Sequence, residues 1–318
     1  MRLSQIYESI IRIGIQNDPR GEEGIQKALE ASHKEYEEIK DRDKARFDRD
    51  RLHNPYADTR ILHGDLESDI RTVLAGIDIE VGEILLAEKV KERGIPIDAV
   101  IAHHPEGVAL AAFYRVMTLQ TDLLNQFGVS VTVAEALLDE RMKEVARKIM
   151  PVNHNRAVMA ARLLDMPFLC CHTPADNAVY AYLRRLFEDK RPYWMGDIID
   201  ILLDIPEYQD QAMINAGPQI LVGSATRRCG RILVDMTGGT EGSKEIYQRL
   251  AQEGFGTIVA MHMSEEHKKE AEANHLNVVI AGHIGSDSLG MNLMFDQVRT
   301  QGDLEIVPCS GYVYHSRN

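Results

Sequence analysis

The chain is poor in the features that mark secreted and membrane-spanning proteins. It has four cysteines in 318 residues, and two of them, Cys170 and Cys171, are adjacent, so no disulfide framework is indicated and a reducing compartment is expected. No apolar run reaches the roughly 18 residues that cross a bilayer, and no secretory cleavage site follows residues 1–16. We therefore expect a cytoplasmic protein with no membrane partner.

Positively charged residues are also fewer than negatively charged ones. The 36 Lys and Arg residues face 49 Asp and Glu residues, which gives a formal net charge of -13. A surface of this sign repels phosphate backbones at long range, which argues against nucleic acid as a partner. A small anionic substrate is still compatible with this charge, because a bound metal reverses the sign of the local field.

Residues 1–55 are expected to form a charged helical arm. Between residues 21 and 51 the charged types dominate, and the few apolar residues, such as Ile25 and Leu29, lie at helical spacing. After the turn at Asn54 and Pro55, apolar runs alternate with amphipathic segments, which is typical of βα units around a buried parallel sheet. We expect an α/β fold with two similar halves, residues 56–190 and 191–318, and mostly parallel sheets.

Two stretches resemble copies of one βαβ unit. The first predicts a strand over residues 72–79, a helix over 81–93 and a strand over 98–102 that runs into His103. The second predicts a strand over 231–236, a helix over 243–252 and a strand over 257–260, followed by Met261 and His262. An internal duplication explains this better than chance. Further helices are expected over 108–127, 137–150, 155–164 and 180–204, and further strands over 168–171, 220–223, 277–281 and 304–307.

The first candidate site follows the strand that ends at residue 102 and consists of His103, His104 and Pro105. Ligands bind at the carboxyl ends of parallel strands, and neutral imidazoles are good ligands for Zn, Mn, Fe or Ni. Neighbouring strand residues point to opposite faces, so each histidine could serve a different ion of a pair about 3.5–4 Å apart. A core histidine beside a solvent-facing one is an equally open interpretation.

The second candidate site again follows an apolar strand and includes His172, Asp176 and Asn177. Asp176 could bridge two metal ions with its two oxygens, and His172 could act as a hydrogen-bond partner or proton shuttle. Cys171 is discounted, because a thiolate among nitrogen and oxygen ligands would suggest structural zinc. A turn stabilised by Asp176 and Asn177 is the alternative.

The third candidate site is the pair His283 and Asp287, after the expected strand over residues 277–281. If a helix begins here, residues four apart lie on one face and can share an ion. The alternative is that Ser286 or Asp287 caps that helix. A histidine therefore follows each of three expected strands that are far apart in sequence. A carboxylate follows two of these histidines. Core packing alone does not readily produce such convergence.

A glycine-rich loop over residues 237–244 separates an expected strand from an expected helix and could contact a phosphate. Its spacing matches neither the P-loop nor the dinucleotide-binding fingerprint. A tight turn with helix entry at Ser243 is the favoured interpretation, and contact with a substrate phosphate is the alternative.

The three clusters, in this order, resemble the Nif3-like family of dinuclear-metal proteins over residues 72–318. The matching motifs are the histidine pair before Pro105, the His-Thr-x-x-Asp segment that ends at Asp176, and the Gly-His pair followed by an acid at position 287. The family usually has glutamate where this chain has Asp287, which is one methylene shorter. The resemblance implies two α/β halves with a dinuclear site between them and assembly into hexamers. It also implies homology to GTP cyclohydrolase type 2.

Together these observations favour a metal-dependent hydrolase that acts on a small phosphorylated or nucleotide-like substrate. Two divalent ions (Zn, Mn, Fe or Ni) would be held by His103, His104, Asp176, His283 and Asp287. The candidates for proton transfer are His172 and Glu106. The alternative is a non-catalytic metal-binding or scaffold protein.

Overall fold

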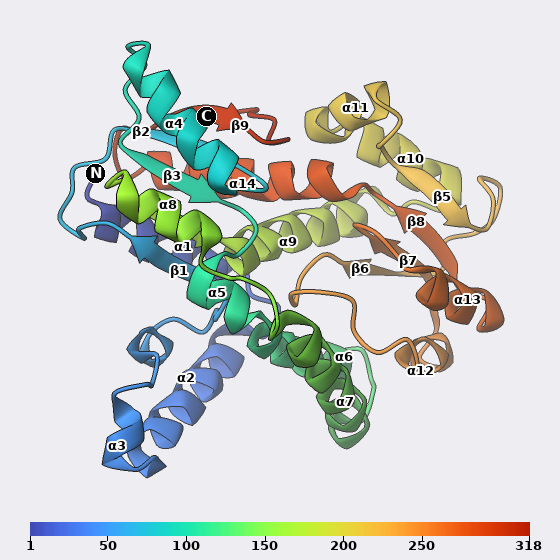
Figure 1. Ribbon diagram of the computed structural model, residues 1–318. Helices are drawn as coiled ribbons and strands as arrows, with labels where there is room; N and C mark the ends of the chain where they lie inside the picture. The colour runs from blue at the N-terminus through green and yellow to red at the C-terminus, as the bar shows by residue number, and fades with distance from the viewer.

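The computed structural model describes all 318 residues and contains two β-sheets surrounded by helices (Figure 1). The strands are β1 (Thr59–His63), β2 (Thr72–Gly76), β3 (Ala99–Ala102), β4 (Phe168–Cys171), β5 (Gln219–Val222), β6 (Arg231–Asp235), β7 (Phe255–Ala260), β8 (Asn277–Ile280) and β9 (Glu305–Cys309). The α-helices are α1 (Leu3–Gln16), α2 (Gly21–Glu38), α3 (Asp41–Lys44), α4 (Val81–Glu92), α5 (Gly107–Ala111), α6 (Leu119–Gln126), α7 (Val131–Ile149), α8 (Arg156–Leu163), α9 (His172–Lys190), α10 (Met195–Leu203), α11 (Pro206–Met213), α12 (Ile246–Gln252), α13 (Glu265–Ala273) and α14 (His283–Arg299). Two 3-10 helices, η1 (Arg49–Leu52) and η2 (Phe113–Thr118), complete the elements.

The two sheets have the same plan. The first has the order β1-β4-β3-β2-β9, and only β1 is antiparallel to its neighbour. The second has the order β5-β8-β7-β6, and only β5 is antiparallel to its neighbour. Each sheet contains three parallel strands that follow one another along the chain, β2, β3 and β4 or β6, β7 and β8. The last of the three, β4 or β8, is followed directly by a long helix, α9 or α14. This confirms the expected α/β fold with two similar halves and mostly parallel sheets.

The inner strands of the first sheet, β2, β3 and β4, are buried on both faces, as the apolar runs predicted. Alternate residues point to opposite faces, so Val73 and Ala75 pack against α1 and α14, whereas Leu74 packs with α4 and α8. In the second sheet, Val259 faces α9 and α10, and Ile258 faces α12 and α13. Helices α9 and α14 therefore contribute to the cores of both sheets.

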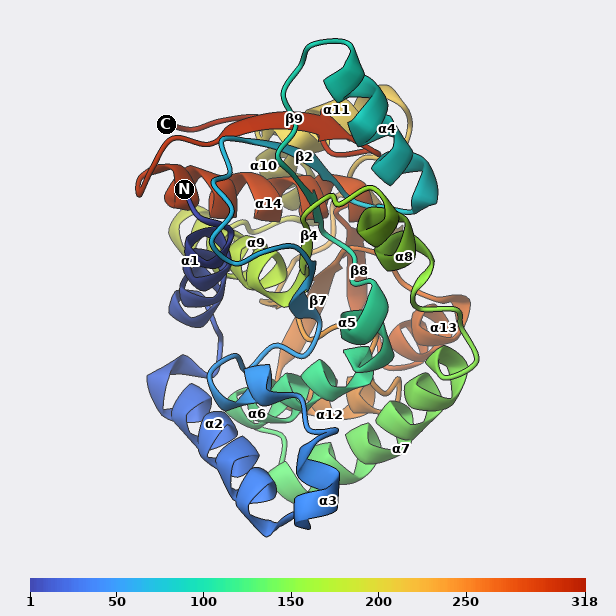
Figure 2. The same cartoon turned by 60° about the vertical axis from the view of Figure 1, so that its left-hand side comes forward.

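The expected arm, residues 1–55, divides into two parts of different character. Helix α1 carries an apolar stripe, and Leu3, Ile6, Ile10 and Ile13 are each at most 2% exposed in the core of the first sheet. Burial of each such side chain contributes about 1.5–3 kcal/mol, so α1 is part of the body. Helix α2 buries only Ile25, and Figure 2 shows α2 and α3 below α1 at the lower edge of the molecule.

The first sheet also takes a strand from the far end of the chain. The strand expected over residues 304–307 forms as β9, and it pairs in parallel with β2 in the first sheet. Nothing local signals this pairing, because the partner strand lies more than 200 residues away in sequence. The division of the chain into residues 1–55, 56–190 and 191–318 stays a prediction.

Several helices differ in extent from the sequence expectation. The segment over 108–127 is divided into α5, η2 and α6, and the segment over 180–204 is the end of α9 followed by α10. Helix α9 starts at His172, directly where β4 ends, and so includes residues that were open to interpretation as a turn. None of the helices combines the length and the apolar character that crossing a lipid bilayer requires. All four cysteines are free thiols.

Candidate metal centre

The histidine pair lies where β3 ends. The backbone N–H groups of His103 and His104 donate to the carbonyls of Gly76 and Ile77 at 2.9 and 3.0 Å, which continues the pairing with β2 for two more residues. His103 is 1% exposed, whereas the side chain of His104 is 27% exposed. Their rings are nevertheless adjacent, with centroids 5.1 Å apart. One ring is thus buried and the other partly exposed, and both reach the same cluster because the strand ends here.

Helix α9 brings in His172 and Asp176 from its first two turns. They are four residues apart and lie on one helix face, with Nδ1 of His172 3.5 Å from Oδ2 of Asp176. Pro174 is tolerated because it lies in the first turn, where its missing N–H has no helical acceptor. Since Asp176 and Asn177 are helical residues, the alternative of a side-chain-stabilised turn is wrong.

Helix α14 supplies His283 and Asp287 in the same arrangement. Gly282 precedes the helix with φ of 108°, a left-handed conformation that favours glycine and lets β8 turn directly into the helix. His283 is the first helical residue, and its Nε2 lies 3.4 Å from Oδ2 of Asp287. Asp287 is thus inside the helix, and the interpretation of Ser286 or Asp287 as a cap is wrong. The duplicated halves therefore place equivalent His-x-x-x-Asp pairs on α9 and α14.

The two carboxylates and the histidine pair meet in one buried cluster. Nε2 of His103 lies 3.5 Å from Oδ1 of Asp176 and 3.4 Å from Oδ1 of Asp287. Nε2 of His104 lies 3.5 Å from Oδ2 of Asp287. The potential ligand atoms form three groups, and the atoms within a group all lie within 4.8 Å of one another. The groups are His103, His104 and His172; His104, His283 and Asp287; and His103, Asp176 and Asp287. All five residues proposed from the sequence as metal ligands come together, and His172 joins them.

Asp287 is the carboxylate that two of these groups share. Its Oδ1 faces His103, and its Oδ2 faces His104 and His283. The sequence interpretation gave the bridging position to Asp176, but Asp176 occurs in one group only. The geometry thus favours Asp287 as the residue between two adjacent cation positions.

The donor atoms of this cluster fit a bound cation. Both ring nitrogens of His103, Oδ1 of Asp176 and both oxygens of Asp287 are buried and have no hydrogen-bond partner in the protein. Buried polar atoms are nearly always paired, because a lone one costs about 1–3 kcal/mol and more when it is charged. Imidazole nitrogen with carboxylate oxygen is the ligand set of Zn, Mn, Fe and Ni. The residues present therefore fit one or more divalent ions.

The protonation states of the cluster are unequal. Burial raises the pKa of Asp176 to about 8. At His172 burial acts to lower the pKa, but the carboxylates of Asp176 and Asp58 outweigh it and raise the pKa to about 9. Burial lowers the pKa of His103 to about 4, which keeps it in the neutral form that binds metals. At Asp287 burial acts to raise the pKa, but the neighbouring imidazole of His103 outweighs it and lowers the pKa to about 2.

Two carboxylates behind the cluster were missed from the sequence. Asp58, which is fully buried, accepts from Nδ1 of His172 at 2.9 Å and from Oγ1 of Thr173 at 2.6 Å. Asp78 accepts from Nδ1 of His104 at 2.6 Å. Hydrogen bonds of this kind orient a ligating or proton-carrying imidazole. A signal existed for Asp78, which follows the end of the parallel strand β2, whereas nothing in the sequence around Asp58 indicates its role.

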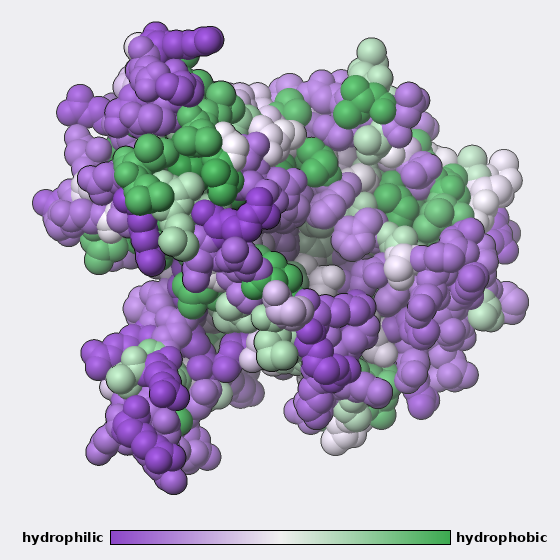
Figure 3. All heavy atoms as spheres, in the orientation of Figure 1, coloured by the Kyte–Doolittle hydropathy of each residue, from purple (hydrophilic) through white to green (hydrophobic).

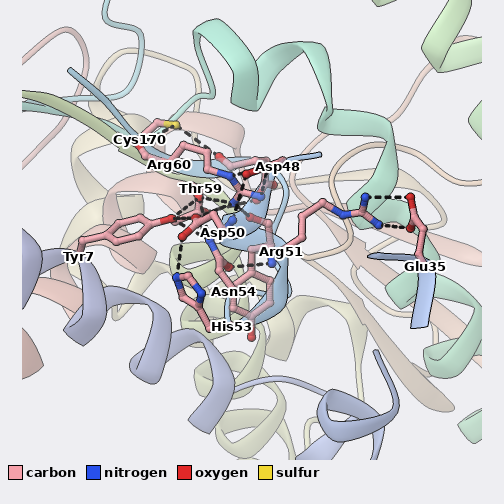
Figure 4. A network of polar contacts seen from close by, with 12 residues as sticks. Tyr7, Glu35, Asp48, Asp50, Arg51, His53, Asn54, Thr59, Arg60 and Cys170 are labelled. Carbon is pink, nitrogen blue, oxygen red and sulfur yellow. Dashed lines mark hydrogen bonds and ion pairs between the residues drawn. The ribbon is translucent and has the colours of Figure 1, made fainter. Parts of the chain in front are cut away.

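A polar network holds the backbone on either side of Asp58 (Figure 4). Arg60 donates to Oδ2 of Asp48 at 3.0 and 2.7 Å, and the hydroxyl of Tyr7 bonds to Asp50 and to the carbonyl of Thr59. Arg60 also donates to the carbonyl of Thr59. The segment between the charged helices and β1 is thereby fixed to α1, and with it the position of Asp58.

Glu106 lies outside the three groups of potential ligands. It is half-buried at the start of α5, and burial together with the nearby Glu80 raises its pKa to about 7. A carboxyl group with this pKa exchanges a proton near neutral pH, so its proposed part in proton transfer stays a prediction.

The glycine-rich loop over residues 237–244 forms a compact turn. Gly238 and Gly239 both have positive φ, and the side-chain amide of Gln120 donates to the carbonyls of Gly238 and Thr240 at 2.7 Å. Helix entry comes at Ile246, later than the expected Ser243, and α12 has only seven residues. The loop borders Asp235 and Glu241, so the surroundings do not favour a phosphate.

No protein-family model and no curated protein matches the chain. Among solved structures it is similar to a NIF3 superfamily protein from Sphaerobacter thermophilus, with a TM-score of 0.69 and 27% identity over 80% of this chain and 91% of that one. It is also similar to reduced HcgD from Methanocaldococcus jannaschii (TM-score 0.49, 16% identity, 78% of this chain and 87% of that one) and to the protein ybgI (0.48, 15%, 80% and 90%). The similarity to the Sphaerobacter protein, together with the three histidine motifs now gathered in one cluster, supports the resemblance of this chain to the Nif3-like family.

Proposed function

We propose that the cluster binds two divalent ions and hydrolyses a small phosphorylated or nucleotide-like substrate. The observation that carries this proposal is the buried, unpartnered carboxylate of Asp287, whose two oxygens face two different sets of imidazoles. Two adjacent ions, one on the side of each oxygen, would give both oxygens a partner. Two ions in this position would act as Lewis acids and would lower the pKa of a coordinated water to near neutrality.

The protein's own residues supply proton transfer and orientation in this proposal. His172 donates from Nδ1 to Asp58, which leaves its Nε2 free to exchange a proton with substrate or solvent. Asp78 holds His104 through Nδ1, so that Nε2 of His104 faces Asp287. Glu106 is the second candidate for proton transfer, because its raised pKa lets it carry a proton at neutral pH.

The test combines metal analysis with turnover. Protein purified without added metal should contain about two ions per chain, and reconstituted protein should hydrolyse at least one member of a panel of phosphomonoesters, phosphodiesters and nucleotides. His104→Ala should lose metal and turnover, while Asp303→Ala, which removes an exposed carboxylate without hydrogen bonds, should lose neither. Stoichiometric metal without turnover on any compound would favour the non-catalytic metal-binding protein instead.

We propose in addition that copies of the chain assemble in the cytoplasm, as a hexamer. Figure 3 shows apolar residues gathered over α4 and α8, and Leu85, Leu86, Met159 and Leu163 on these helices are 43–85% exposed. Contiguous apolar surface of this kind often marks a protein contact. Sedimentation analysis of the wild-type chain and of Leu163→Glu tests this, since the variant should shift toward smaller species.

A further inference from the structure

A hollow adjoins the metal cluster on the side of the second sheet. It is lined by residues from the ends of β6 and β7, the loop after β6 and α9, among them Asp176, Asp235, Glu241 and His262. The carboxyl ends of neighbouring parallel strands are where α/β proteins bind ligands. The position of this hollow therefore suits a small molecule that also reaches the metal centre.

Two side chains in the hollow have no partner within the protein. Asp235 ends β6, and His262 follows β7 by two residues, at strand ends that pair side by side. Both are exposed, and neither forms a hydrogen bond or an ion pair with another residue. The ring of His262 lies 5.0 Å from that of His283, which joins the hollow to the metal cluster. A free carboxylate and a free imidazole are thus presented to whatever enters.

The wall shared with the metal centre also carries an unsatisfied atom. Asp176 is 4% exposed, its Oδ1 has no hydrogen-bond partner, and the residue lines both the hollow and the cluster. A molecule in the hollow consequently contacts the same residue as a cation at the cluster. The hollow and the metal centre thus share Asp176 as a common wall.

The internal duplication accounts for the presence of a histidine, His262, just after β7. In the first half, Ala102 at the end of β3 is followed by His103 and His104, and in the second half Ala260 at the end of β7 is followed by Met261 and His262. His262 thus occupies the position equivalent to His104, but it belongs to none of the groups of potential metal ligands. The second half keeps a strand-end histidine that the metal centre does not use.

The lining determines which chemistry the hollow accepts. It contains three carboxylates and no lysine or arginine. Glu241 accepts from the backbone N–H of Ser264 at 2.5 Å, and Asp176 belongs to the metal cluster, so Asp235 is the carboxylate left for a ligand. A carboxylate accepts hydrogen bonds and repels anions, and hydrogen bonds to a charged partner are the stronger ones.

We propose that Asp235 and His262 form a subsite for an N–H donor group of the substrate, such as an ammonium group or the amino group of an amide or heterocycle. The proposal rests on the proposed function in one respect: the opposite end of the substrate lies at the metal ions. The substrate is then polar at both ends, with the bond to be cleaved at the metals and a nitrogen group in the hollow.

Hydroxamic acids test this subsite without knowledge of the substrate, because the hydroxamate chelates metal and the tail enters the hollow. Tails of two to five methylenes that end in an ammonium, a primary carboxamide or a methyl group are compared by calorimetry on the Zn²⁺-loaded protein. At the best length, an N–H-bearing tail should bind roughly tenfold tighter than the methyl tail. The ratio of ammonium to carboxamide affinity distinguishes a cationic from a neutral donor.

Variants assign the effect to Asp235. Asp235→Ala should abolish the preference for N–H tails and leave the affinity of the methyl tail unchanged, which also shows that fold and metal centre are intact. Glu245→Ala removes an exposed acid outside the hollow and should retain the preference. Metal-dependent binding without discrimination between tails would overturn the subsite alone. Failure of every hydroxamate to bind would overturn the proposed function and the subsite with it.

Discussion

The carboxylate of Asp58 accepts a hydrogen bond from Nδ1 of His172 at 2.9 Å, although the two residues are 114 positions apart. Burial acts to lower the pKa of His172, but the charge of the nearby Asp176 and this hydrogen bond outweigh burial and raise the pKa to about 9. The pair fixes the orientation of the ring and keeps Nδ1 as the hydrogen-bond donor, which leaves Nε2 as the atom that exchanges a proton.

Asp58→Asn should therefore lower the pKa of His172 toward its ordinary range. The isosteric amide keeps an acceptor for Nδ1 and for Thr173 but removes the negative charge. NMR titration of histidine-labelled, metal-free protein measures the shift, and Asp303→Asn serves as the control. An unchanged titration of His172 would show that Asp58 does not hold its proton.

Asp287 and His283 should differ in how many ions depend on them. Asp287→Ala removes the residue shared by two groups of potential ligands and should reduce bound metal from about two ions to none. His283→Ala removes a residue found in one group and should leave about one ion per chain. Elemental analysis of dialysed protein measures both, and equal losses in the two variants would contradict the shared position of Asp287.

Much of this site could be predicted because its signals are local. His103, His172 and His283 each follow an apolar strand, and the end of a parallel strand is a known place for ligands. The His-x-x-x-Asp spacing on α9 and α14 also needs only helical periodicity. These features depend on neighbouring residues, which is why sequence reasoning reached them.

The remaining features depend on contacts between distant segments. The choice between capping and ligation at Asp287 was open until the structure showed the helix starting at His283. Asp58 reaches His172 only because β1 pairs with β4 at the register Thr59 to Cys171. The role of Asp235 likewise depends on β6 and β7 ending side by side. Strand pairing across a hundred or more residues leaves no local pattern in the sequence.

Metal binding should depend on pH through Asp176. Its pKa, raised to about 8 by burial, leaves this carboxyl protonated at pH 7 in the metal-free protein, whereas a ligand must be ionised. Affinity should rise with pH between 6 and 8, and binding should release about one proton per chain at pH 7. His103 and Asp287 do not titrate in this window, because their pKa values are lowered to about 4 and about 2.

Calorimetry in buffers of different ionisation enthalpy counts the released protons. Asp176→Asn has no proton to lose at this position and should release about one fewer. If the wild type and the variant release the same number, another group supplies the proton and the assignment to Asp176 fails.

The crossing of α9 and α14 should be sensitive to a single methyl group. A Cβ at Gly290 would lie 2.9 Å from the backbone carbonyl carbon of Ala175, closer than real contacts allow, so the two helices must separate to admit it. Overpacking of this kind costs about 1–3 kcal/mol of unfolding free energy. Gly82→Ala in α4, where nothing lies within 4 Å, should instead stabilise the protein by about 0.5 kcal/mol through helix propensity.

Gly290→Ala should also weaken metal binding, because Ala175 precedes Asp176 on α9 and Gly290 lies one turn beyond Asp287 on α14. Separation of the helices moves these two carboxylates apart, whereas a distance error of even a fraction of an ångström matters at a metal site. Thermal unfolding and metal titration of the two glycine variants together test this coupling. Lower stability with unchanged affinity would mean that the crossing supports the fold but does not set the spacing of the two carboxylates.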